Sequence, residues 1–192
     1  MGHRRDRKQG GGGALGAPTV AEDPRSIERH IRVISSTLTI RQAEVADLDA
    51  VARLWCALQE MRTQFHDCYE PSDDALTLRR AELGEILAQE NTIFSVAVEP
   101  GGQVVGYCLG SIEESPPTLT EERVGVISSM FVDRNSRDAG IGQTMLRAVT
   151  DALAREGVGR VEVTLCAENA DAIRFLEAQR FELHTVTLTR NL

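Results

Sequence analysis

The residues best placed to do chemistry form one short loop, Arg137-Asp138-Ala139-Gly140-Ile141-Gly142-Gln143. A strand pattern ends at Val132 and a helical pattern begins at the glycines, so we expect strand, turn and helix in succession. The first amides of a helix have no intrahelical partner and lie at the positive end of its dipole, where they bind anions. Glycine lets the backbone approach such an anion because no Cβ intervenes, and Arg137 adds a positive charge. The loop therefore predicts a phosphate-binding turn.

Two common phosphate-binding loops are excluded by the neighbouring residues. A dinucleotide fingerprint needs a third glycine, where this chain has Met145. A Walker loop needs Gly-Lys-Ser/Thr, and Lys8, in the N-terminal region, is the only lysine. The same count excludes a Schiff-base lysine in the folded part. A glycine pair alone is also typical of any tight strand-to-helix turn. On these residues alone, a purely structural turn remains an alternative to a phosphate site.

Other candidate residues for catalysis are scattered along the chain. They are a strand tyrosine, two serines, a polar stretch rich in reactive side chains and two loop carboxylates: Tyr107, Ser128, Ser129, His66-Asp67-Cys68-Tyr69, Glu113 and Glu114. Packing or a solvated loop is the alternative for each. The stretch from His66 to Tyr69 could instead line a substrate pocket, and Glu113 and Glu114 could meet a cationic amine. The four cysteines contain no Cys-x-x-Cys pair, so we expect reduced thiols and no metal site.

Hydrophobic periodicity predicts the elements that must position these residues. We expect strands over residues 38–41, 93–98, 104–112, 124–132, 161–165 and 181–188, and helices over 48–61, around 83–87, from the glycine loop to near Gly157, and over 170–178. Asp47 is expected to cap the first helix, and Gly101-Gly102 to close a hairpin. The order β-α-α-β-β-β-α-β-α-β predicts a mixed α/β fold.

Length, charge and composition bound the class of protein. The 192 residues favour one domain. Residues 1–36 carry seven basic and four acidic side chains and are predicted to be a flexible N-terminal extension, whereas residues 37–192 carry fourteen and twenty-five. So acidic a domain is a poor nucleic-acid binder, because phosphate contacts need a basic surface. No secretory signal or membrane-length apolar run is present, so we expect a cytoplasmic protein without membrane or nucleic-acid partners.

Arg137-Asp138-Ala139-Gly140-Ile141-Gly142 resembles the acetyl-CoA pyrophosphate loop of the GNAT superfamily of N-acetyltransferases, whose pattern is Arg/Gln-x-x-Gly-x-Gly/Ala. Three further segments resemble the first, third and fourth strands of that family: Ile40-Arg41-Gln42-Ala43 with Asp47-Leu48, Val104 to Tyr107, and Ile127 to Val132. Asn169, Ala172 and Phe181 resemble its second cofactor segment. The likeness covers residues 38–192 in the family's order.

The resemblance implies a GNAT-like α/β fold: a central, mostly antiparallel sheet with splayed fourth and fifth strands and helices on both faces. Acetyl-CoA would enter between those strands as cosubstrate, without a metal. The implied cofactor-binding residues lie on the fourth strand, in the loop and on the last helix: Met130, Phe131, Val132, Arg137, Asp138, Ala139, Gly140, Ile141, Gly142, Gln143, Asn169, Ala172 and Phe175. Arg134, Arg147 and Arg174 could reach the 3′-phosphate or could simply be exposed.

The chain departs from the family pattern at three positions. Leu176 stands where many members have a tyrosine that protonates the leaving thiolate, and Ser128 where many have a glutamate. Arg180 precedes Phe181 where glycine is usual. The usual acid and base therefore cannot be carried over, and Tyr107 and Ser128 are the candidates for catalysis.

The resemblance implies an N-acetyltransferase that moves the acetyl group of acetyl-CoA directly to a primary amine of a small molecule or a protein. The alternative, prompted by the two missing side chains, is a non-catalytic sensor that binds CoA or acetyl-CoA. A nucleotide binder unrelated to CoA fits less well, because the P-loop and dinucleotide signatures are missing. A homodimer is compatible with the family, whose terminal strands often pair across subunits.

Overall fold

The computed structural model describes residues 31–34, 38–116, 118, 123–136 and 140–190. Its strands are β1 (Arg32–Ile34), β2 (Thr39–Gln42), β3 (Thr92–Val98), β4 (Val104–Glu114), β5 (Arg123–Val132) and β6 (Val161–Val163). Its α-helices are α1 (Leu48–Thr63), α2 (Ala75–Leu87), α3 (Ile141–Arg155) and α4 (Ala170–Ala178). Short 3-10 turns cover η2 (Val45–Asp47), η3 (Asp67–Tyr69) and η4 (Arg134–Ser136).

The six strands form one sheet in sequence order, β1-β2-β3-β4-β5-β6. All neighbours are antiparallel except β5 and β6, which run parallel because α3 connects them. The expected hairpin turns at Gly102, whose φ of 83° suits glycine. This mixed sheet confirms the predicted fold class.

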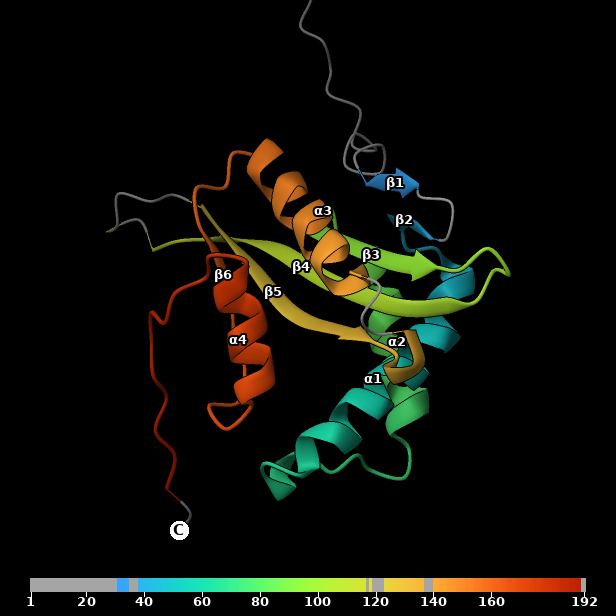
Figure 1. The fold of residues 1–192 in the computed structure, drawn as a ribbon, viewed down its shortest axis with the longest axis horizontal. Coiled ribbons are helices and arrows are strands. Elements are labelled where there is room, and N and C mark those ends of the chain that lie inside the picture. The colour runs from blue at the N-terminus through green and yellow to red at the C-terminus, as the bar shows by residue number, and fades with distance from the viewer. Residues whose placement is uncertain (1–30, 35–37, 117, 119–122, 137–139, 191–192) are drawn as a thin grey trace, which may run out of the picture.

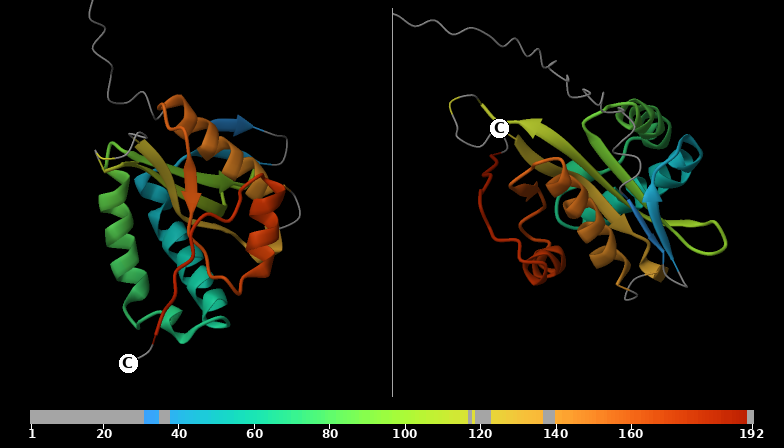
Figure 2. Two further views of the ribbon diagram at one scale, coloured as in Figure 1. Left: turned by 90° about the vertical axis from the view of Figure 1, so that its left-hand side faces the viewer. Right: turned by 90° about the horizontal axis from the view of Figure 1, so that it is seen from above.

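Helices cover both faces of the sheet (Figures 1 and 2). Helices α1 and α2 pack over one face, in a core that includes Val51, Leu83 and Phe94. Helix α3 packs over the other face through Met145 and Val149, and α4 joins the same core. The three- and four-residue spacing of apolar side chains in α1 and α3 was the signal that predicted these buried stripes.

Two N-terminal features differ from the sequence prediction. Asp47 does not cap α1 with its side chain; its carboxylate accepts hydrogen bonds from Arg41 at 2.7 and 2.9 Å and from the Glu44 amide at 2.8 Å. A nearby guanidinium offers two charge-assisted bonds, which outweigh one cap bond. Residues 32–34, within the predicted extension, form β1 and pair with β2.

The prediction of a last strand over residues 181–188 is wrong. Residues 181–190 have no regular secondary structure, and Leu183 and Leu188 are 87% and 91% exposed. A strand requires a partner for its backbone groups, and no described strand lies beyond the three-residue β6. The homodimer stays a prediction.

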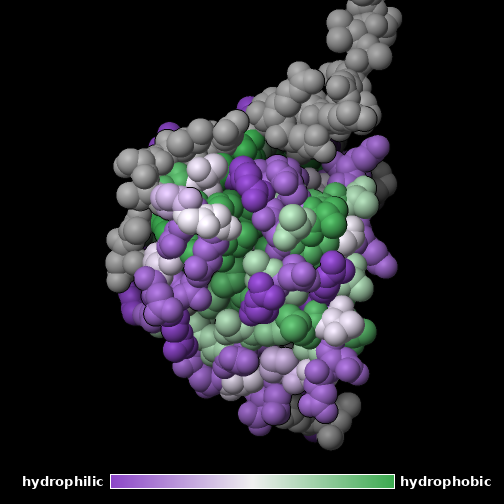
Figure 3. All heavy atoms as spheres, turned by 90° about the vertical axis from the view of Figure 1, so that its right-hand side faces the viewer, coloured by the Kyte–Doolittle hydropathy of each residue, from purple (hydrophilic) through white to green (hydrophobic). Residues whose placement is uncertain are grey.

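The surface is of mixed polarity. On the side that faces away from α4, hydrophilic residues interrupt the apolar surface (Figure 3). No helix in the described part of the chain is both long and apolar enough to cross a membrane.

Candidate functional site

The sheet opens between its two parallel strands. Pairing of β5 with β6 runs from Gly125–Val161 to Ile127–Val163 and stops there, whereas β5 continues to Val132 paired with β4. Strands β5 and β6 are the fourth and fifth of the predicted core, so the expected splay is present. The sheet therefore carries a gap beside the second half of β5.

The register of β5 turns part of its backbone toward this gap. The Asp133 amide donates to the Val105 carbonyl at 2.8 Å, and Tyr107 faces Phe131 in the same register. Hydrogen-bonded and non-hydrogen-bonded pairs alternate in an antiparallel ladder. The main-chain groups of Met130, one residue from Phe131, therefore point away from β4 and into the gap.

The N-terminus of α3 lies next to the same gap. Gly140 has a φ of 70°, a left-handed conformation that favours glycine, and its carbonyl accepts the first helical bond, from Thr144 at 3.0 Å. Within the described residues, the amides of Ile141, Gly142 and Gln143 donate no hydrogen bond. Such amides are the anion-binding groups of a helix start.

Gly142 joins the helix start to the gap. A Cβ at this position would lie 3.5 Å from Met130 Cε and 3.5 Å from Phe175 Cζ. The structure therefore brings together three residues of the predicted cofactor set, from α3, β5 and α4. Arg137, Asp138 and Ala139 of that set lie outside the described residues.

The second predicted cofactor segment builds α4. Asn169 caps this helix, because its Oδ1 accepts from the Ala172 amide at 3.1 Å. Ala172 and Phe175 are half-buried. The helix ends with Arg180 at a φ of 67°, and the amides of Arg180 and Phe181 donate to the carbonyls of Glu177 and Leu176. This Schellman end explains why glycine suits the position of Arg180.

The arginines considered for the 3′-phosphate are exposed. Arg134 lies in η4 after β5, Arg147 lies 3.7 Å from Asp151, and Arg174 forms an ion pair with Asp171. No group of metal-ligating side chains is found among the described residues.

The α1/α2 face of the gap carries a hydrogen-bonded pair that the sequence did not reveal. The Tyr107 hydroxyl lies 2.6 Å from Ser129 Oγ. Burial raises the pKa of Tyr107 to about 12. The hydrogen bond with Ser129 and the charges of Arg79 and Arg62 lower this pKa, but burial has the larger effect. The phenol is therefore protonated at neutral pH, and both guanidinium groups lie on its side of the sheet.

Ser128 occupies a β-bulge. Leu109 faces Ser129 and Gly110 faces Ile127, so Ser128 is the extra residue. It is exposed, and its Oγ donates to the Leu109 carbonyl at 3.4 Å. The bulge changes the alternation of side chains, so Ile127 belongs to the α3/α4 core, whereas Ser129, two residues before Phe131, lies on the face of Tyr107.

Three of the four cysteines are poor nucleophiles because their pKa values are raised. Burial raises the pKa of Cys108 to about 12, and burial also raises that of Cys56. The hydrogen bond from Cys166 Sγ to Glu168 Oε2, at 2.7 Å, raises the pKa of Cys166. Each thiol therefore retains its proton more firmly than a free cysteine.

The remaining candidates lie in η3 and at the end of β4. His66 Nδ1 accepts from the Cys68 amide at 3.1 Å, which fixes the start of η3. Glu113 and Glu114 are exposed at the end of β4, beyond the bulge; Glu114 lies 3.9 Å from Arg123. Their contact with a substrate stays a prediction.

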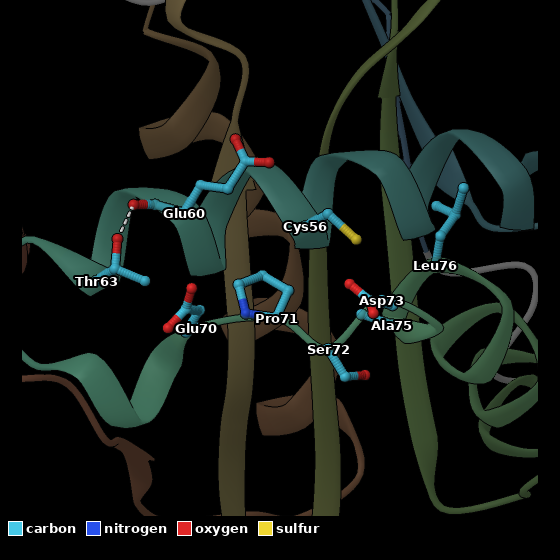
Figure 4. Close-up of a pocket in the computed structure, with 9 residues that line it drawn as sticks. All are labelled: Cys56, Glu60, Thr63, Glu70, Pro71, Ser72, Asp73, Ala75 and Leu76. Atoms are coloured by element: carbon cyan, nitrogen blue, oxygen red, sulfur yellow. Dashed lines mark hydrogen bonds between the residues drawn. The ribbon is translucent and has the colours of Figure 1, made fainter.

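Two hollows open between α1, the η3 loop and α2. One, of about 430 Å³, has three carboxylates in its wall, Glu60, Glu70 and Asp73 (Figure 4). The other, of about 390 Å³, is lined by Trp55, Gln59, Tyr69, Arg79 and other residues of the same elements. Helix packing assembles the walls of both hollows, and Cys68 and Tyr69, from the stretch that the sequence singled out, line the second.

The chain thus has a GNAT-like α/β fold, in which a helix that starts at a glycine lies beside an opening in the sheet. The chain belongs to the acetyltransferase (GNAT) family, whose family model matches residues 55–181. This confirms the resemblance inferred from the sequence. Members of this family use acetyl-CoA.

Solved structures share the fold at low sequence identity. The tetramutant of the BH1408 protein from Bacillus halodurans has a TM-score of 0.73 and 24% identity, over 80% of this chain and 99% of that one. A transcriptional regulator from Bacillus halodurans C-125 has a TM-score of 0.66 and 20% identity, over 81% and 99%. The aminoglycoside N-acetyltransferase AAC(6')-Iy in complex with CoA has 0.63 and 22%, over 83% and 98%. No curated protein sequence matches the chain.

Proposed function

We propose that this protein is an N-acetyltransferase that moves the acetyl group of acetyl-CoA directly to a primary amine. The observation that carries the proposal is the gap between β5 and β6 beside the amides of α3. The pyrophosphate would bind Ile141, Gly142 and Gln143, and the pantetheine arm would follow the Met130 backbone toward the gap. We propose that the other residues of the predicted cofactor set also contact acetyl-CoA.

The two faces of the sheet separate the two substrates in this proposal. Met130 packs toward the α3/α4 core, where the cofactor would enter, whereas Tyr107 belongs to the α1/α2 core, where the acceptor would lie. The gap is then the passage through which the thioester meets the amine. A main-chain N–H that points into this gap can stabilise the oxyanion that develops during transfer.

Transfer through a covalent acetyl-cysteine at Cys166 is disfavoured. A covalent acetyl-cysteine intermediate needs a thiolate, and the pKa of Cys166, the cysteine that follows β6, is raised by its bond to Glu168. The amine must lose its proton first: at a pKa near 10.4, this costs roughly 4.6 kcal/mol at pH 7. We expect water to carry that proton to a carboxylate.

Tyr107 would act by positioning Ser129. A phenol with a pKa of about 12 is a weak proton source for a thiolate, whose conjugate acid has a pKa near 8.5. As a hydrogen-bond donor to Ser129 Oγ, however, it leaves the serine O–H free to point at the charge that develops in the gap. Leu176 is buried in the core and supplies no acid.

Two measurements test the function. Acetyl-CoA and CoA should raise the melting temperature while ATP does not, and a panel of primary amines should release CoA thiol from acetyl-CoA. Stabilisation by acetyl-CoA without thiol release on any amine would favour a non-catalytic CoA sensor. The absence of the usual tyrosine and glutamate is the observation that supports this alternative. Stabilisation by ATP alone would contradict both.

A further inference from the structure

We propose that the acceptor amine carries a carboxylate, which Arg79 and Arg62 bind on the α1/α2 face of the gap. This inference rests on the proposed function and names its substrate class. It concerns the hollow of about 390 Å³ between α1, the η3 loop and α2.

Arg79 is a buried cation with unused donors. Its side chain is only 10% exposed and lines the hollow. Nη1 donates to Glu82 at 2.8 Å, Nε is buried without a partner, and Nη2 makes no hydrogen bond within the described residues. The guanidinium also lies 5.1 Å from the Trp55 ring. The exposed Glu82 carboxylate orients this cation without using all its donors.

Arg62 supplies a second cation beside the gap. Its guanidinium stacks on Tyr69, 3.9 Å from the ring centroid, and Tyr69 lines the same hollow. Among the described residues, the Arg62 side chain makes no ion pair. Its charge lowers the pKa values of both Tyr107 and Cys166. The two arginines thus flank the face on which the acceptor would lie.

A carboxylate suits this pair better than other charged groups. A planar guanidinium fork matches a carboxylate in geometry, and Glu70 and Glu82, which also line the hollow, would repel a doubly charged phosphate. The three carboxylates in Figure 4 offer the opposite preference, for a polycationic acceptor. Of these three, however, Glu60 is exposed and Asp73 lines only the first hollow, whereas Gln59, which lines the second, is buried.

The test compares amines that differ in one carboxylate. Thiol release is measured with lysine against 1,5-diaminopentane and with phenylalanine against phenylalaninamide, at saturating acetyl-CoA. The carboxylate form of at least one pair should show kcat/KM about tenfold higher, the size of one charge-assisted hydrogen bond. Arg62→Gln should reduce this preference toward unity, because it raises KM for the acid more than KM for the amide or the diamine. Arg53→Gln, an exposed charge on the same helix, is the matched control and should retain the preference.

The inference and the function fail separately. If in both pairs the form without the carboxylate reacts as well as the acid, or if Arg62→Gln lowers both rates equally, the carboxylate proposal is overturned while the acetyltransferase stands. If no amine reacts, calorimetry measures the affinity of the CoA-bound protein for the same pairs of amines. Equal affinity for the amines with and without the carboxylate, or no binding of either, overturns the inference. Arg79→Lys, which retains the buried charge, should weaken binding of the acid alone.

Discussion

Replacement of Gly142 by aspartate isolates the proposed pyrophosphate site from the fold. A Cβ at this position meets Met130 and Phe175 at 3.5 Å, an ordinary van der Waals distance, so the helix accepts a side chain. Glycine in a helix costs about 1 kcal/mol relative to alanine, and a carboxylate in the first turn gains about 0.3–1 kcal/mol from the dipole. We therefore expect the variant to be at least as stable as the parent.

Binding should respond in the opposite direction. Two like charges about 5 Å apart repel by about 3 kcal/mol at an effective dielectric constant of 20, which corresponds to a loss of acetyl-CoA affinity of roughly a hundredfold. Isothermal titration calorimetry measures this loss. Gly142→Asn, of the same size without the charge, separates electrostatics from steric filling, and Gly101→Asp, in open space at the hairpin, controls for added charge elsewhere. A folded Gly142→Asp variant with unchanged affinity would refute the placement of the pyrophosphate.

Three further predictions concern other parts of the site. Tyr107→Phe removes the bond to Ser129 and should lower kcat about tenfold and stability by about 1 kcal/mol, with calorimetric acetyl-CoA affinity unchanged; an unchanged kcat would remove its positioning role. Arg180→Gly relieves a left-handed φ of 67° and should stabilise the protein by up to about 1 kcal/mol in denaturant unfolding, a result that a destabilised variant would contradict. Glu168→Gln replaces the charged acceptor of the Cys166 proton with a neutral, weaker one, so the pKa of Cys166 should fall and its alkylation below pH 9 should accelerate in a background without Cys56 and Cys68; an unshifted pH profile would show that the Glu168 carboxylate does not hold this proton.

The helices and most strands could be predicted because their signals are local. Apolar spacing in α1 and α3 follows the buried face, and Gly140 takes the positive φ that a glycine at a helix start suggests. The C-terminal segment could not be predicted in this way. Its alternating residues satisfy the strand pattern, but a strand also needs a partner edge, and that requirement is not local.

The acceptor side of the site depends on contacts that no spacing reveals. Ser129 meets Tyr107 because β4 and β5 pair with Phe131 opposite Tyr107 and Ser129 opposite Leu109, and a one-residue change of register reverses which side chain faces which side. Likewise, Arg62 and Arg79 come from different helices and gather only when α1 packs on α2. The sequence predicts the cofactor loop because that function resides in contiguous backbone, whereas the acceptor site is assembled by packing.

A crystal structure of the protein with acetyl-CoA bound tests the proposed cofactor site. We predict pyrophosphate oxygens within hydrogen-bond distance of the amides of Ile141, Gly142 and Gln143, the pantetheine arm paired with the backbone at Met130, and the thioester in the gap between β5 and β6. A cofactor bound elsewhere, with β6 paired to β5 beyond Ile127, would contradict the account.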